Sequence, residues 1–119
     1  MYEIYMGIPQ MEEYWDSLTK KVNSKTCTKG EALIYKKLLK TFRLLSDNPR
    51  HKSLHTHEIK ELIDRYEMKV WESYIDNKTP NALRLFWVYY PNGGITIIGV
   101  EPHPNDKKNA YKKINLSNI

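Results

Sequence analysis

The spacing of apolar residues changes abruptly near residue 50, and this change constrains the fold more than any other feature of the chain. Before it, apolar residues recur every three or four positions, as Met11 and Leu18 do within residues 9–23 and as others do within residues 30–47. This is the period of an amphipathic helix. After it, apolar residues form short runs bounded by turn residues, which is typical of strands. The chain is therefore predicted to be an α+β domain in which two helices precede a sheet.

Both predicted helices carry signals at their ends. Pro9 opens the first, and acidic residues in its early turns favour the positive end of the helix dipole. The second begins at Gly30 and is expected to stop at Asp47-Asn48-Pro49, because proline cannot continue a helix. The connection between them is short, so we expect a helical hairpin packed on one face of the sheet, with Trp71 or Trp87 in the core.

Three or four antiparallel strands are expected after the helices. They are predicted at residues 54–59, 69–75, 83–90 and 95–100. The first of these is the least regular, because residues 58–66 also fit a helical period. The last two flank Pro91-Asn92-Gly93-Gly94, a strong turn sequence, and should form a hairpin.

Simple pairing of these strands aligns polar side chains in one row. If Tyr90 faces Ile95 across the turn, Arg84 lies opposite Glu101. If Ile75 faces Leu83 on the other side of the same strand, Tyr74 lies beside Arg84. Side chains recur on a face every second residue. Glu72 and His103 should therefore join the same face as this row.

Length and composition indicate one domain spanning residues 1–119. A chain of 119 residues that is 40% apolar can bury one core. It contains no apolar run long enough for a membrane span and no signal-like start, so we expect a cytoplasmic protein without a membrane partner. Cys27 is the single cysteine and cannot form an intramolecular disulfide.

The net charge of +5 is unevenly distributed along the chain. Residues 1–19 sum to −4, residues 20–43 to +7, residues 44–102 to −1 and residues 103–119 to +3. A concentrated basic segment favours a polyanion or an acidic protein as partner, although a lysine-rich face also serves solubility alone.

Four segments of the chain resemble the RelE/ParE superfamily of bacterial toxins from toxin–antitoxin pairs. They are Asn48-Pro49-Arg50, residues 53–59 (Ser-Leu-His-Thr-His-Glu-Ile), the Arg84-bearing strand at residues 82–87, and the last strand with the tail that contains His103, Lys107, Lys108 and Tyr111. The resemblance implies a helical hairpin on an antiparallel sheet and an antitoxin protein as partner. For members of the RelE kind it also implies cleavage of ribosome-bound messenger RNA without a metal or other cofactor.

The resemblance also implies roles for individual residues. Arg84 would hold the scissile phosphate and His103 would transfer a proton, with His57 as a second proton-transfer group and Tyr111 as an additional contact. Contacts to the RNA are expected from Arg50, Lys52, His55, Lys60, Lys107 and Lys108.

Each assignment has a plainer alternative. Arg84 could form a cross-strand ion pair with Glu101, His103 could be a turn histidine, and His55 or His57 could be a polar partner in the core. A His-x-His pair can also bind zinc, but nothing in the spacing supplies a third ligand. At the level of the whole protein, the alternatives are a toxin-fold protein that only binds its antitoxin or another macromolecule, and a basic RNA-binding module.

Overall fold

The computed structural model describes residues 1–76, 82–102, 111 and 114–119. Ten elements follow one another along the described chain. In order they are β1 (Ile4–Met6), α1 (Gln10–Asn23), α2 (Lys29–Asp47), the 3-10 turn η1 (Lys52–Leu54), β2 (His57–Glu58), the 3-10 turn η2 (Lys60–Leu62), α3 (Ile63–Tyr66), β3 (Trp71–Tyr74), β4 (Leu83–Tyr89) and β5 (Ile95–Pro102).

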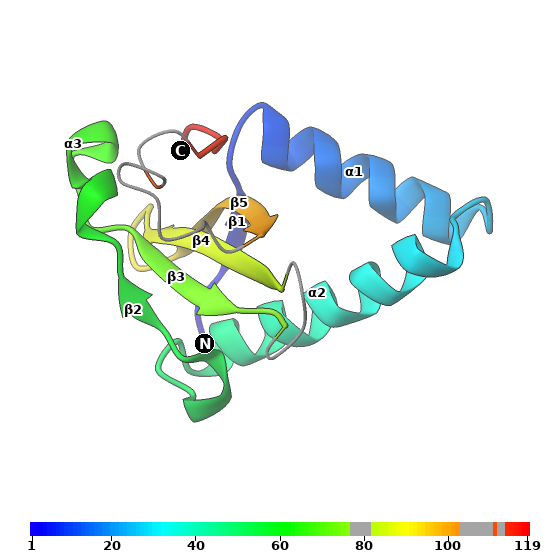
Figure 1. Ribbon diagram of the computed structural model, residues 1–119, viewed down its shortest axis with the longest axis horizontal. Coiled ribbons are helices and arrows are strands. Elements are labelled where there is room, and N and C mark those ends of the chain that lie inside the picture. The colour runs from blue at the N-terminus through cyan, green and yellow to red at the C-terminus, as the bar shows by residue number, and fades with distance from the viewer. Residues whose placement is uncertain (77–81, 103–110, 112–113) are drawn as a thin grey trace.

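The two long helices confirm the predicted helical hairpin. They meet at their connecting loop and diverge toward the sheet (Figure 1). The loop ends in a reciprocal cap, because the Thr28 hydroxyl accepts from the Glu31 backbone N–H at 3.0 Å and the Glu31 carboxylate accepts from the Thr28 N–H at 2.9 Å. This capping box satisfies two amide groups that the first turn of α2 leaves unpaired.

The sheet differs from the prediction in strand number and direction. In the described chain it has five strands in the order β1-β5-β4-β3-β2, and β1 runs parallel to β5. The expectation of three or four antiparallel strands, all following the helices, was therefore wrong. A three-residue strand such as β1 carries no readable alternation, and its partner Ile95 lies far away in sequence. Pairing with β5 is the reason that β1 exists as a strand.

Residues 54–66 are also less regular than expected. Only His57 and Glu58 form a strand there, paired with Glu72 and Trp71 of β3. The η2 turn and α3 follow, so the helical period in residues 58–66 was a real signal confined to about one turn.

The predicted row Tyr74–Arg84–Glu101 is confirmed, although the assumed turn register was wrong. Ile95 pairs with Tyr89 rather than with Tyr90. A bulge between Phe86 and Trp87 of the β4–β5 ladder adds one residue to β5, and this restores the pairing of Arg84 with Glu101.

A separate hydrophobic core lies on each face of the sheet. On one face, α1 and α2 pack on the side chains of Trp71, Leu85 and Trp87. On the other, η2, α3 and the segment around Leu116 pack on Phe86 and on further apolar side chains of β4 and β5. Trp71 and Trp87 thus both belong to the core, as predicted, and β4 reads as a nearly continuous apolar strand because it is covered on both sides.

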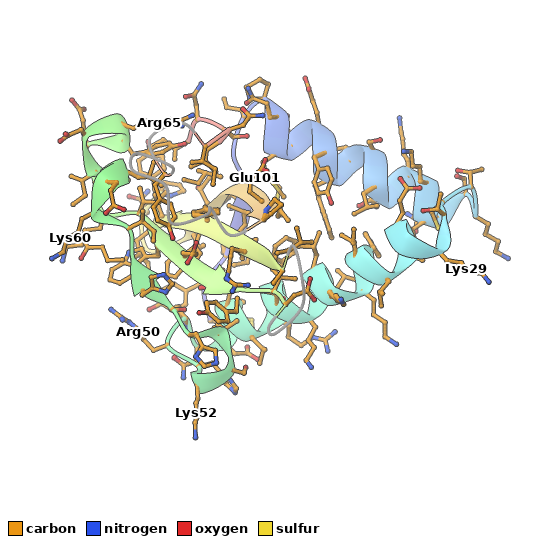
Figure 2. The ribbon with its side chains drawn as sticks, in the orientation of Figure 1. Lys29, Arg50, Lys52, Lys60, Arg65 and Glu101 are labelled. Carbon is orange, nitrogen blue, oxygen red and sulfur yellow. The ribbon has the colours of Figure 1, made fainter. Side chains whose placement is uncertain are left out.

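Hydrogen bonds from side chains to backbone carbonyl groups fix the C-terminal residues to the second face. Arg65 donates to the carbonyl groups of Ile114 and Leu116, each at 2.8 Å, and the Tyr66 hydroxyl donates to the carbonyl group of Ser117. Figure 2 shows Arg65 beside this C-terminal segment. The second face is therefore covered near α3 by the end of the chain.

Candidate functional site

The face of the sheet opposite the helical hairpin carries a group of polar side chains. Glu72 and Tyr74 of β3 alternate with residues that face the helices, and Tyr74 pairs directly with Arg84 of β4. The group, called the polar cluster below, comprises His55, His57, Glu72, Tyr74, Arg84 and Tyr111.

His57 and Glu72 form the closest ionisable pair of the polar cluster. Pairing of β2 with β3 places these two residues opposite each other, and Nε2 of His57 lies 2.7 Å from Oε2 of Glu72. The Nδ1 atom of His57 lies 2.9 Å from the carbonyl oxygen of His55, which can only accept, so Nδ1 carries a hydrogen. Nε2 and Oε2 are within ion-pair distance, and the two residues form an ion pair when the imidazole is protonated. Nε2 is then the ring atom that can carry a transferable proton.

The two members of this pair differ sharply in exposure. The His57 side chain is 44% exposed, whereas that of Glu72 is 0% exposed. A fully buried carboxylate is costly unless it is paired and hydrogen-bonded. Glu72 is thus suited to orient His57 from the buried side, while part of the His57 ring is exposed to solvent.

Tyr111 is a second hydrogen-bond donor to Glu72. Its hydroxyl donates to Oε1 of Glu72 at 3.4 Å, and its ring packs edge-on against Phe86. Burial and then the neighbouring Glu72 carboxylate raise the pKa of Tyr111 well above the ordinary 10.0. The phenol therefore keeps its proton at neutral pH and acts as a donor, never as a base.

Arg84 is a buried cation anchored by backbone carbonyl groups. It is only 7% exposed, and its Nη1 donates to the carbonyl oxygens of Asp76 at 2.7 Å and of Leu83 at 3.3 Å. Its guanidinium carbon lies 3.7 Å from the centre of the Tyr74 ring, within cation–π distance. The Nε atom of Arg84 is buried and has no hydrogen-bond partner among the described residues. The cluster therefore contains a buried positive charge with one donor left over.

The alternative reading of Arg84 as half of an exposed ion pair is wrong. Arg84 and Glu101 are register partners, yet the ion pairs within the described part of the chain do not include them. Burial raises the pKa of Glu101 above its ordinary value, so this carboxylate gains little from the nearby cation. Glu101 lies on β5, away from β2 (Figures 1 and 2).

His55 joins the polar cluster through Tyr74. It adopts the left-handed backbone conformation, with φ at 48°, at the end of η1. The two rings lie 4.7 Å apart, and the His57 ring lies 6.4 Å from the same tyrosine. Tyr74 thus contacts both histidines and Arg84.

Other predicted site residues lie elsewhere. Arg50 stacks on Trp71 at 4.5 Å, on the face that carries the helices. Lys52 and Lys60 are exposed and project away from the sheet (Figure 2). His103, Lys107 and Lys108 lie outside the described residues. The structure therefore brings together Arg84, His57, His55 and Tyr111 and separates Arg50 from them.

Glu72, Tyr74 and Asp76 are the site residues to which the sequence reasoning gave no role. It placed Glu72 and Tyr74 on the correct face, but their contacts depend on β2, which was the least regular strand of the prediction. The available signal was a carboxylate in the short strand Trp71-Glu72-Ser73-Tyr74, where an acid is unusual unless it has a partner.

The polar cluster offers proton transfer and anion binding. It combines the closely spaced His57–Glu72 pair, a protonated phenol and a buried guanidinium. No group of three or more potential metal ligands occurs among residues 1–76, 82–102, 111 and 114–119. These side chains suit acid–base chemistry on an anionic substrate.

No known protein family, curated protein or solved structure matches this chain. Within the described residues, no helix combines the length and apolar character needed to cross a membrane.

Proposed function

We propose that this protein is a toxin of the RelE/ParE kind that cleaves messenger RNA on the ribosome without a metal. The observation that carries the proposal is the His57–Glu72 pair, whose Nε2 and Oε2 atoms lie 2.7 Å apart, on the same sheet face as the buried Arg84. The helical hairpin and the Arg84-bearing strand also agree with the sequence resemblance. Acid–base groups beside a fixed cation are the requirement for cleaving a phosphodiester.

The reaction needs only groups of the RNA and of the protein. The ribose 2′-OH attacks the adjacent phosphorus, so a bond forms between the 2′-oxygen and phosphorus while the bond from phosphorus to the 5′-oxygen breaks. A base accepts the 2′-OH proton, and an acid donates a proton to the departing 5′-oxygen. The products are a 2′,3′-cyclic phosphate and a free 5′-OH, and no external reactant is consumed.

The His57–Glu72 pair is assigned the role of proton donor. A protonated imidazole would be stabilised by the Glu72 carboxylate 2.7 Å from Nε2, and the His57 side chain is accessible whereas Glu72 is not. After donation, a neutral imidazole and a carboxylate remain, and the next turnover begins when they regain a proton from water. Glu72 is a positioning residue in this scheme because it acts through His57.

Arg84 is assigned to the phosphate. Negative charge grows on the non-bridging oxygens as the pentavalent transition state forms, and a guanidinium donates to such oxygens with favourable geometry. The hydrogen bond to the Asp76 carbonyl group fixes the cation before the substrate arrives. One such preorganised donor contributes on the order of 3 kcal/mol to transition-state stabilisation. His103 remains the proposed base, and Tyr111 a hydrogen-bond donor to the site.

Arg84 and His57 variants test the proposal in a translation-coupled assay. Arg84→Lys retains the charge but loses the planar donor set, and His57→Gln retains a polar side chain without the transferable proton. Both should lose cleavage of ribosome-bound messenger RNA, while Lys69→Gln, an exposed control just before β3, should retain it. Full cleavage by folded Arg84→Lys and His57→Gln proteins would contradict the assignment.

A binding function without catalysis is the second candidate, and the surface of α2 favours it. Leu33 is 53% exposed and lies among exposed cations that include Lys36 and Arg43. An acidic antitoxin segment with apolar residues would complement this face. Its binding should weaken as salt rises. A folded protein that binds the antitoxin but never cleaves RNA would support this candidate over the enzyme.

A further inference from the structure

A hollow of about 320 Å³ lies beside the polar cluster, at the end of β3. It opens between α2, η1 and β3, and it shares Tyr74 with the cluster. Its lining residues are Lys37, Lys40, Thr41, Leu44, Ser53, Leu54, Tyr74 and Ile75.

The hollow combines an apolar interior with a cationic rim. Leu44, Leu54 and Ile75 supply flat aliphatic surface. Lys37 is paired with Asp76 at 2.7 Å, whereas Lys40 is exposed and takes part in no ion pair within the described chain. A purely apolar ligand would not need the unpaired cation. The chemistry fits a ligand with a flat, weakly polar part and a negative charge.

The hollow is linked to Arg84 through contacts of Asp76 and Tyr74. The Asp76 carboxylate accepts from Lys37 at the rim, and the Asp76 backbone carbonyl accepts from Arg84 at 2.7 Å. The Arg84 guanidinium also stacks on the Tyr74 ring that lines the hollow. The hollow and the cation assigned to the scissile phosphate are therefore linked through Tyr74 and through the Lys37–Asp76 pair.

We propose that this hollow receives the base of the nucleotide adjoining the scissile phosphate, with Lys40 contacting the phosphate group of that nucleotide. The inference rests on the proposed ribonuclease function and specifies its substrate as single-stranded RNA with an unstacked base beside the cleavage point. Only an unpaired strand can present a base in this way. The aliphatic surface takes the face of the base, and the two cations, Arg84 and Lys40, take successive phosphates.

Equilibrium binding of a short 2′-O-methyl RNA tests the phosphate contact, because this probe lacks the attacking hydroxyl and is not cleaved. Lys40→Glu should weaken its binding about tenfold, whereas Lys36→Glu, which makes the same charge change one turn earlier on α2, should weaken it less than about threefold. Equal effects of the two substitutions would overturn the proposal, since they would indicate attraction by net charge alone.

An abasic scan of the same probe tests the base pocket. Removing one base at each position in turn should reveal a single position that costs the wild type about tenfold in affinity. Ser53→Trp, which fills the hollow from η1, should abolish that dependence, and Leu39→Trp, an exposed control on α2 that does not line the hollow, should preserve it. A flat scan in the wild type would overturn the proposal. Lys40-dependent binding of an acidic peptide in place of the RNA would overturn it equally.

The proposed substrate site in the hollow and the proposed ribonuclease function can be contradicted independently. If the wild type cleaves messenger RNA but Lys40→Glu binds the probe as the wild type does, the hollow is not a substrate site and the ribonuclease function stands. If the wild type neither binds the probe nor cleaves, both are wrong. Circular dichroism of each variant shows whether it is folded. If Ser53→Trp does not fold, the binding of the probe by Lys40→Glu still tests the proposed site.

Discussion

Replacing Glu72 by glutamine removes the carboxylate charge from the His57–Glu72 pair but keeps the positions of the two side chains. Glutamine matches glutamate in volume, so the 0% exposed site stays filled. Its amide N–H can donate to Nε2 of His57, while Nδ1 continues to donate to the His55 carbonyl group, 2.9 Å away. The ring orientation is thus preserved, but the carboxylate charge that stabilises a protonated imidazole is lost.

The expected effects on stability and on catalysis differ greatly in size. A charge-assisted hydrogen bond contributes about 1.5–3 kcal/mol and a neutral one about 0.5–1.5 kcal/mol, so the exchange costs about 1 kcal/mol. Removing a buried charge offsets part of this cost. General acid catalysis, by contrast, contributes about 100- to 10,000-fold to a rate. Glu72→Gln should therefore remain folded and lose at least about 100-fold in cleavage rate.

Single-turnover cleavage of ribosome-bound messenger RNA, combined with urea unfolding, measures both effects. The loss should fall on kcat rather than on KM, and the pH–rate profile should lose the limb that reports the proton donor. Glu58→Gln is the matched control, because Glu58 is next to His57 on β2 but points to the opposite face. A Glu72→Gln protein that cleaves at the wild-type rate with the wild-type pH profile would refute the role of the pair.

Three further predictions concern stability. Thr28→Ala removes the capping box with Glu31 and should lower the free energy of unfolding by about 1 kcal/mol; an unchanged urea midpoint would contradict this. Ser73→Ala leaves the buried Trp87 indole N–H without its acceptor at 2.8 Å and should cost about 1–3 kcal/mol, whereas a cost near zero would show that another acceptor replaces it. Burial raises the pKa of Glu101 above 4.5, so the folded state binds its proton more tightly than the unfolded chain and ionisation at higher pH costs stability. Glu101→Gln should therefore raise the melting temperature near pH 7.5 and have little effect near pH 4, and a pH-independent effect would contradict the sign.

The substitution Arg84→Ala illustrates how burial changes an expectation made from the sequence. With Arg84 in an exposed ion pair, truncation to alanine would cost only about 0–1 kcal/mol. In the structure Arg84 is 7% exposed and donates to the Asp76 carbonyl group, which truncation would leave without this donor. We now expect a cost of about 1–3 kcal/mol. Arg84→Lys is therefore the better probe of function.

Local patterns predicted the parts of the fold that depend on nearby residues. The helix boundaries followed from Pro9, Gly30 and the Asn48-Pro49 stop, because capping and proline effects act within one turn. The long hairpin followed from apolar runs on both sides of a strong turn sequence. The parallel pairing of β1 could not be predicted this way, since a three-residue strand is defined by its distant partner.

The polar cluster was predictable only in part for the same reason. Counting residues along the strands paired Arg84 correctly with Tyr74. It paired Arg84 correctly with Glu101 because two offsets cancelled: the turn register was one residue out, and the β5 bulge restored it. The contact between His57 and Glu72 depends on a two-residue strand whose position is set by tertiary packing. The burial of Arg84 depends on the backbone of Asp76, and no sequence pattern reports a carbonyl direction.

The chemistry of the RNA ends tests the central claim most directly. Messenger RNA recovered from ribosomes after incubation with the wild-type protein should carry a 2′,3′-cyclic phosphate on the upstream fragment and a 5′-OH on the downstream one. Arg84→Lys protein should leave the messenger intact under the same conditions. Intact messenger with folded wild-type protein, or fragments with 5′-phosphate ends, would contradict cleavage by 2′-OH attack at the polar cluster.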